Sequence, residues 1–455
     1  MPVLFVWSTG AFALAGSKGV SMKGMFFVSW LFFPSFLFAQ TFVPQLISVR
    51  SDVQNPQNIT YLPSGDKVIF SDVTGAYQIL DTHGQGVLSE KIIDVQDLGS
   101  SFALMSDFSV SDVSGLCSFR VESTAGTSLQ YTYNSPTPLP SPEIADTSDY
   151  LTWIHGADDI YIYSAGVNVS GQLLFRVHDP LSGSPLGEVD VMSYFTIPVP
   201  AWKIVARDGV AFFVGIETGT NTLRVLRIQY TGDRRTPFVV ANNSYSADGI
   251  LSLTQVKVDD VHPTLIILGH DTNSIAHVWN INSDTMSVRH SFTESIALTR
   301  ITNCGTGVTK YRPITDSTVS VQHIDANGNM PFSLVMNYSE IETVRDLTLA
   351  PDNRLFMLSH INNLQSGDIN MDGTVDLADI VFFLSYLFQE GEAPQSLNIA
   401  NVNGDDVVNI ADAVYLINYL FIGGPAPVEL PGGASAGEAA VVRSLAFPYM
   451  LLCLN

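Results

Sequence analysis

Short runs of alternating or β-branched apolar residues fill most of the chain between about residues 45 and 362, and clusters of Gly, Asn, Asp, Ser and Pro separate them. No long helical pattern interrupts these runs. Several runs come in pairs joined by turn residues, which is typical of β-hairpins. The clearest predicted hairpins are Lys67–Phe70 with Ala76–Leu80, Asp159–Tyr163 with Gln172–Val177, Val210–Val214 with Leu223–Ile228, and Thr264–Leu268 with Ala276–Ile281.

These hairpins recur at a regular interval of 43 to 51 residues. A repeat of about 40–50 residues with several strands per unit is typical of a β-propeller, and seven units would close a ring. A stack of β-sandwich domains, with repeats of about 100 residues, and a single irregular jelly roll are the alternatives. We therefore predict a mainly β fold, a seven-bladed-type β-propeller over residues 45–362, with the first strand of each unit near Ile59, Phe102, Leu151, Trp202, Leu253, Leu298 and Val344.

The pattern changes from Asn363 onward. Apolar residues recur every three or four positions in residues 377–387 and again in residues 410–421, which predicts two amphipathic helices. No Lys or Arg occurs between Arg354 and Arg443, whereas nine carboxylates lie between residues 368 and 412. We assign residues 366–424 to a small α-helical module that follows the propeller. Residues 425–455 open with Pro and Gly-rich sequence and are predicted to be a linker-like tail.

A 12-residue loop precedes each predicted helix and spaces oxygen ligands as a hard cation requires. Ca²⁺ takes six to eight oxygens, and a Gly at the sixth loop position permits the sharp turn. Gly373 occupies that position in the first loop. The predicted ligands of the first loop are the side chains of Asp368, Asn370, Asp372, Asp376 and Asp379, with the Thr374 carbonyl.

The second loop repeats this arrangement 33 positions later. Its first position carries Asn401 instead of Asp, and its sixth carries Asp406 instead of Gly, so we predict a weaker site. Two helices and two loops make a core too small to be stable alone, so calcium binding should be coupled to folding. The predicted ligands of the second loop are Asn401, Asn403, Asp405, the Val407 carbonyl, Asn409 and Asp412.

Residues 367–424, with their tandem EF-hand-like loop–helix repeats and Asp at the twelfth loop position, resemble a dockerin type I module. The resemblance implies docking onto a cohesin domain on a scaffold or cell surface, in the setting of secreted polysaccharide-degrading systems. The family's recognition positions fall on Leu377 with Ala378 and on Ile410 with Ala411, and the basic residues that often follow them are absent. An intramolecular or novel partner therefore stays open. Separately, residues 275–281 resemble the closing strand of a WD40 or quinoprotein-like propeller blade.

The amino-terminal residues predict export. Lys18 and Lys23 precede an apolar run of 15 residues that ends at Ala39, a length that suits a signal-peptide core better than a membrane span of about 20 residues. We assign residues 1–39 to a signal peptide, with Met22 as an alternative start. An uncleaved membrane anchor is the other interpretation. A secreted or cell-surface protein follows from the first.

Charge excludes several partners. The 21 Lys and Arg residues face 44 Asp and Glu residues, a formal charge of −23, which repels nucleic acids and anionic lipid headgroups. No zinc helix, phosphate-binding loop or Cys-x-x-Cys pair occurs. We interpret His155, His178 and His270, which lie next to or near acids, as loop and turn residues, and we assign no catalytic residues.

Two functions remain open. The first is an exported, non-catalytic protein whose propeller binds a ligand or partner, such as a polysaccharide, and whose calcium-dependent module attaches it to another extracellular protein. The second is a polysaccharide-active glycoside hydrolase or lyase with the propeller as its catalytic domain. Convergent carboxylates over a deep pocket would favour the enzyme.

Overall fold

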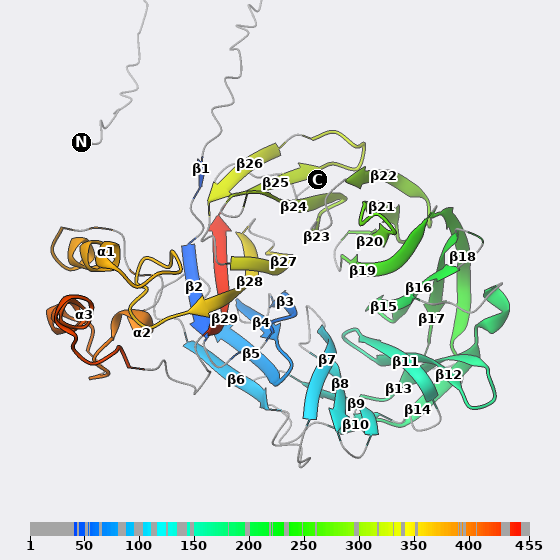
Figure 1. The fold of residues 1–455 in the computed structure, drawn as a ribbon. Coiled ribbons are helices and arrows are strands. Elements are labelled where there is room, and N and C mark those ends of the chain that lie inside the picture. The colour runs from blue at the N-terminus through cyan, green and yellow to red at the C-terminus, as the bar shows by residue number, and fades with distance from the viewer. Residues whose placement is uncertain are drawn as a thin grey trace, which may run out of the picture. The chain divides into compact units, whose positions relative to one another are not determined.

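Antiparallel strands make up nearly all of the regular structure before residue 365 (Figure 1). The predicted signal peptide lies outside the residues that the computed structural model describes. The model describes residues 41–446 except 43–44, 51–52, 54, 63–65, 81–87, 95–102, 111–115, 124–125, 134–142, 146–149, 181, 196–200, 218–219, 221, 232–235, 248, 260–261, 295–299, 316–317, 331, 338–341, 351–353, 390, 392–393, 395–396, 406 and 429–436.

The described strands form seven sheets, and five of these are built from four strands that follow one another in the chain. These five sheets comprise β3 (Asn58–Leu62), β4 (Lys67–Ser71), β5 (Gly75–Leu80) and β6 (Leu88–Asp94); β7 (Ala103–Val110), β8 (Leu116–Ser123), β9 (Gly126–Tyr133) and β10 (Glu143–Ala145); β11 (Tyr150–Ala157), β12 (Ile162–Asn168), β13 (Leu173–His178) and β14 (Pro185–Asp190); β15 (Ala201–Arg207), β16 (Val210–Glu217), β17 (Thr222–Gln229) and β18 (Phe238–Ser246); and β19 (Ile250–Val258), β20 (Thr264–Asp271), β21 (Ala276–Asn282) and β22 (Val288–Glu294).

The other two sheets each include a strand from the beginning of the chain. A 3₁₀ turn, η2 (Met192–Tyr194), follows β14. These two sheets have the orders β1 (Thr41–Phe42), β26 (Phe332–Asn337), β25 (Thr318–Ile324), β24 (Gly307–Thr315), β23 (Arg300–Cys304), and β2 (Gln45–Arg50), β29 (Gly437–Ala446), β28 (Arg354–Leu364), β27 (Glu342–Leu349).

The sheets are arranged as a propeller (Figure 1). Each first strand lies against the first strand of the next sheet, from β7 through β11, β15, β19 and β23 to β27, and β27 lies against β3. These first strands start within a few residues of the positions expected from the periodicity. The prediction of a mainly β propeller is therefore confirmed.

The core lies between neighbouring sheets, which explains the apolar character of the middle strands. Every described residue of β13 is buried, whereas β18 alternates between half-buried and exposed residues because it is an outer strand. Phe175 and Phe213 pack in one cluster between two adjacent sheets. Burial on both faces needs continuous apolar runs, and burial on one face needs alternation.

A buried carboxylate ties the first strands of three sheets together. Asp346 of β27 accepts the backbone N–H of Ile59 in β3 at 3.1 Å and the side-chain amide of Gln255 in β19 at 2.6 Å. Lys257 of β19 also donates to Asp346, at 3.1 Å. The charge of Asp346 is thus balanced where these strands meet.

The predicted hairpins are found, with one shift. The pairs β4–β5, β16–β17 and β20–β21 lie where the sequence placed them. The remaining hairpin, β12–β13, starts at Ile162 and not at Asp159, because Asp158 accepts the backbone N–H groups of Ile160 and Tyr161, both at 2.8 Å. A side chain that closes a tight turn in this way removes those residues from the strand.

The helical module interrupts the last sheet. Residues 437–446, expected within a linker-like tail, form β29, which pairs with β28 on one side and β2 on the other. In the chain, the module therefore lies between two strands of the propeller, β28 and β29, and does not follow the whole propeller. β2 and β29 lie side by side in Figure 1, although they come from opposite ends of the chain.

The module contains α1 (Leu377–Gln389), α2 (Leu397–Ala400) and α3 (Ile410–Ile422). Phe383 and Leu416 meet in a small core between α1 and α3. Asn409 caps α3 by accepting the backbone N–H of Ala411, and Gly423, with φ of 74°, ends the helix. Among the helices that the structure describes, none has the length and apolarity needed to cross a bilayer.

Candidate metal centre

The first loop brings its two end carboxylates to the same place. The backbone N–H groups of Asn370 and Asp376 donate to Asp379 Oδ1 at 3.0 Å and Oδ2 at 2.8 Å. The N–H of Gly373 donates to Asp368 Oδ2 at 3.0 Å, and Gly373 adopts a φ of 92°, as the turn requires. The loop therefore wraps around Asp368 and Asp379.

These two carboxylates are buried in a module whose sequence contains no Lys or Arg. Both Asp368 and Asp379 have no exposed surface. Burial, reinforced by the negative charge of Asp379, raises the pKa of Asp368 to about 7. Burial also raises the pKa of Asp379. No Lys or Arg lies between residues 355 and 442 to balance these negative charges. A bound cation would balance them.

The remaining predicted ligands of the first loop are accessible oxygens. Asp372, Thr374 and Asp376 are exposed, and Asn370 is half-buried. Asp372 accepts the side-chain amide of Asn370 at 2.9 Å and the hydroxyl of Thr374 at 2.7 Å. Oxygens of carboxylates, an amide and a backbone carbonyl are the ligands that Ca²⁺ prefers, so the residues fit this ion.

The first loop fits calcium by the type and the spacing of its oxygen atoms, and not by a cluster of carboxylates alone. Within the part of the chain that the structure describes, no three His, Cys, Asp or Glu side chains converge into a metal-binding group. Such a group would leave out the Asn oxygen and the Thr374 carbonyl, which the loop contributes. The ligand assignments remain predictions.

The second loop has the same backbone arrangement. The N–H groups of Asn403 and Asn409 donate to the two oxygens of Asp412 at 3.3 and 2.9 Å. Asn401 accepts the N–H of Gly404 at 3.1 Å, and Val407 donates to Asp405 at 2.9 Å. Asn401 brings a neutral oxygen where the first loop has a buried carboxylate, so this site has the lower negative charge. Asp406 lies outside the described residues.

Matched apolar residues remain uncovered on both helices. Leu377, Val381 and Phe388 on α1, here called the α1 face, are 53% to 63% exposed. The residues 33 positions later on α3, Ile410, Val414 and Phe421, are 49% to 62% exposed and form the α3 face. The spacing of i, i+4 and i+11 places each set along one side of its helix.

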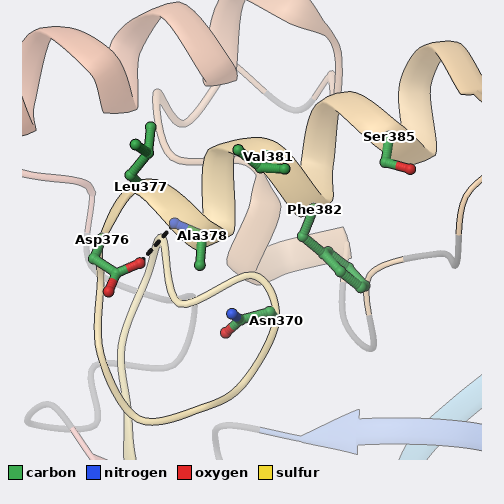
Figure 2. Close-up of a pocket in the computed structure, with 7 residues that line it drawn as sticks. All are labelled: Asn370, Asp376, Leu377, Ala378, Val381, Phe382 and Ser385. Carbon is green, nitrogen blue, oxygen red and sulfur yellow. Dashed lines mark hydrogen bonds between the residues drawn. The ribbon is translucent and has the colours of Figure 1, made fainter.

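An open hollow lies next to the α1 face (Figure 2). Apolar side chains dominate its lining. Of its polar residues, Asn370 and Asp376 lie in the calcium loop, where Asp376 accepts the N–H of Ala378 at 2.6 Å, and Ser385 lies further along α1. The hollow therefore joins the predicted metal loop to the exposed helix. Its lining residues are Asn370, Asp376, Leu377, Ala378, Val381, Phe382 and Ser385.

The propeller histidines are strand residues, which corrects the sequence interpretation. His155 lies in β11, His178 in β13 and His270 in β20. Each pairs with a hydroxyl across its sheet or a neighbouring one: Ser118 at 2.9 Å, Ser164 at 2.7 Å and Thr254 at 2.6 Å, respectively. Local sequence does not reveal these pairs because the hydroxyls lie 14 to 37 residues away.

Comparison with known proteins identifies the module. Residues 366–421 match the sequence model of the dockerin type I domain. No curated protein sequence matches this chain. The chain thus carries a dockerin type I domain within a β-propeller.

Solved structures similar to this chain share little of its sequence. A chain in the crystal structure of the mitotic checkpoint complex is 11% identical with a TM-score of 0.44, and the match covers 77% of this chain and 95% of that one. The Dos1 propeller is 12% identical with a TM-score of 0.42, covering 70% and 83%. Sqt1 of Saccharomyces cerevisiae is 10% identical with a TM-score of 0.41, covering 66% and 80%.

Proposed function

We propose that this is an exported protein whose dockerin domain binds two calcium ions and attaches the propeller to an extracellular protein. The observation that carries the proposal is the buried pair Asp368 and Asp379, held together by loop N–H groups in a module without Lys or Arg. Calcium neutralises this pair and fixes α1, so docking depends on the metal. The second, less charged loop binds the weaker ion.

The partner is a cohesin-like protein with an apolar surface bordered by basic residues. The α1 and α3 faces offer apolar side chains, and the recognition positions Leu377 and Ile410 carry no hydroxyl. Nine carboxylates against four calcium charges leave the module acidic even when it is loaded. A basic border would therefore steer the partner, and the apolar centre would hold it.

The propeller supplies a binding surface for a further ligand in this proposal, in a polysaccharide-related extracellular setting. This setting is supported by the occurrence of dockerin domains in secreted cellulosome components. The enzymatic alternative gains no support from the comparisons, and no residue is assigned to catalysis.

The test uses the full-length protein and purified cohesin domains immobilised on a biosensor, with calcium or with chelator. We expect calcium-dependent binding that Val381→Asp together with Val414→Asp weakens at least tenfold. Val240→Asp is the matched control, because Val240 is a comparably exposed valine on β18 of the propeller. The proposed function would be overturned if calorimetry detects no heat of calcium binding and calcium leaves the helix content of the protein unchanged.

A further inference from the structure

The dockerin domain is inserted at the point where the propeller closes. β28 ends at Leu364 and β29 starts at Gly437, and these two residues are register partners in the same ladder. The 72 residues from 365 to 436 lie between them in sequence. The pairing of β28 with β29 therefore closes a loop that contains the whole calcium-binding module.

β29 joins the two ends of the chain. It lies between β28 and β2, and in the described structure β29 is the strand through which β2 enters its sheet. Ala440 and Val442 of β29 are 1% exposed and pack with Phe70 of β4 and Phe356 of β28. Detachment of β29 would thus release β2 and open the core between the first and last sheets.

The folded module holds its own two ends together. The N–H of Gly367 donates to the carbonyl of Ile399 at 3.0 Å, and the N–H of Val428 donates to the carbonyl of Val402 at 3.0 Å. A Cβ atom on Gly367 would lie only 3.4 Å from Pro427 Cγ. The first and last residues of the folded module are therefore neighbours, which an unfolded module would not ensure.

We propose that calcium binding by the dockerin domain stabilises closure of the propeller, because the folded module shortens the loop that β28 and β29 must close. The inference rests on the proposed calcium binding. Without the ion, the repulsion between buried Asp368 and Asp379 opposes folding of the module, and the loop behaves as a flexible chain of 72 residues.

The size of the effect follows from chain entropy. With the module folded between Gly367 and Val428, only about ten residues of connecting sequence remain in the loop, 365–366 and 429–436. The probability that a loop closes falls as about the three-halves power of its length. Shortening the loop from 72 to about ten residues therefore favours the closed ladder about 20-fold. The module acts as a calcium-dependent clamp on the last sheet.

The experiment is amide hydrogen exchange on the full chain, with calcium or with chelator. We expect calcium to slow exchange about 20-fold in residues 437–446 and 45–50, if these open together. Residues 210–217 in β16 are the internal control and should be unaffected. Asp379→Ala should abolish the difference between the two conditions.

A second variant tests the loop argument with the module intact. Inserting 20 Gly and Ser residues between residues 430 and 435 lengthens the folded-state loop to about 30 residues, so the calcium effect should fall to about fivefold. The same insertion between residues 232 and 235, next to β17, should leave the full effect. An unchanged effect in the first variant would overturn the loop mechanism.

The outcomes separate this inference from the proposed function. Calorimetry of the full chain reports calcium binding independently of exchange. If calcium binds but exchange in residues 45–50 and 437–446 does not change, the clamp is wrong and the calcium-binding function stands. If calcium does not bind, both are wrong.

Discussion

Asp379→Asn is the most informative single change, because it alters one buried carboxylate that the whole first loop surrounds. Asp379 accepts two backbone N–H groups, at 3.0 and 2.8 Å, and has no exposed surface. Asn has one acceptor oxygen, so one buried N–H loses its partner at a cost of about 1–3 kcal/mol. Loss of a charged calcium ligand adds a comparable cost. We expect a total of about 3 kcal/mol, or roughly 100-fold weaker calcium binding at this site.

Asp376→Asn is the matched control, since it makes the same chemical change three positions away. Asp376 is exposed, and Asn keeps the oxygen that accepts the N–H of Ala378. We expect less than about a tenfold loss there, because an exposed ligand that contacts the ion through water contributes less. Calorimetric titration of the full-length variants with calcium measures both, with the second loop as internal reference. Equal losses in the two variants would refute the role of Asp379 as the central ligand.

Four further predictions concern the same module. Asn401→Ala should weaken calcium binding less than Asp379→Ala, measured by calorimetry, because Asn401 contributes no charge. Calcium affinity should fall about tenfold for each pH unit below about 7, because a proton must then leave Asp368, whose pKa is raised to about 7. The same raised pKa makes the calcium-free module less stable as pH rises from about 4 towards 7, which chelator-treated protein should show in thermal unfolding followed by helicity. Phe383→Ala should destabilise the loaded module by about 3–5 kcal/mol in urea unfolding, whereas exposed Phe388→Ala should change it by less than about 0.5 kcal/mol.

Much of the propeller was predictable because a hairpin is a local object. The runs around Val210 and Leu223 pair with each other across a short turn, so their alternation and spacing identify both strands. The start of β12 was misplaced because a side-chain hydrogen bond decided it. Asp158 caps a turn there, and Tyr163 donates to the same carboxylate at 2.7 Å. Apolar periodicity carries no information about such a bond.

The histidine pairs show a second limit of the sequence. Ser118 lies in β8 and His155 in β11, in different sheets, yet their side chains are 2.9 Å apart. Neither residue is flanked by a motif that announces the other. Only the packing of one sheet against the next brings them together.

The calcium loops and strand β29 differ most in how far local sequence predicts them. The calcium loops could be predicted from local sequence, because the predicted ligands of each ion lie within 12 consecutive residues and their spacing follows the coordination geometry. The role of residues 437–446 depends on long-range pairing that local sequence does not show. Gln45 and Ser444 pair across 399 positions, and nothing near Ser444 in the sequence indicates that partner. Long-range pairing depends on where the propeller brings the two ends of the chain together. Because β28 pairs with β29, the dockerin domain is inserted in the chain between two strands of the last sheet.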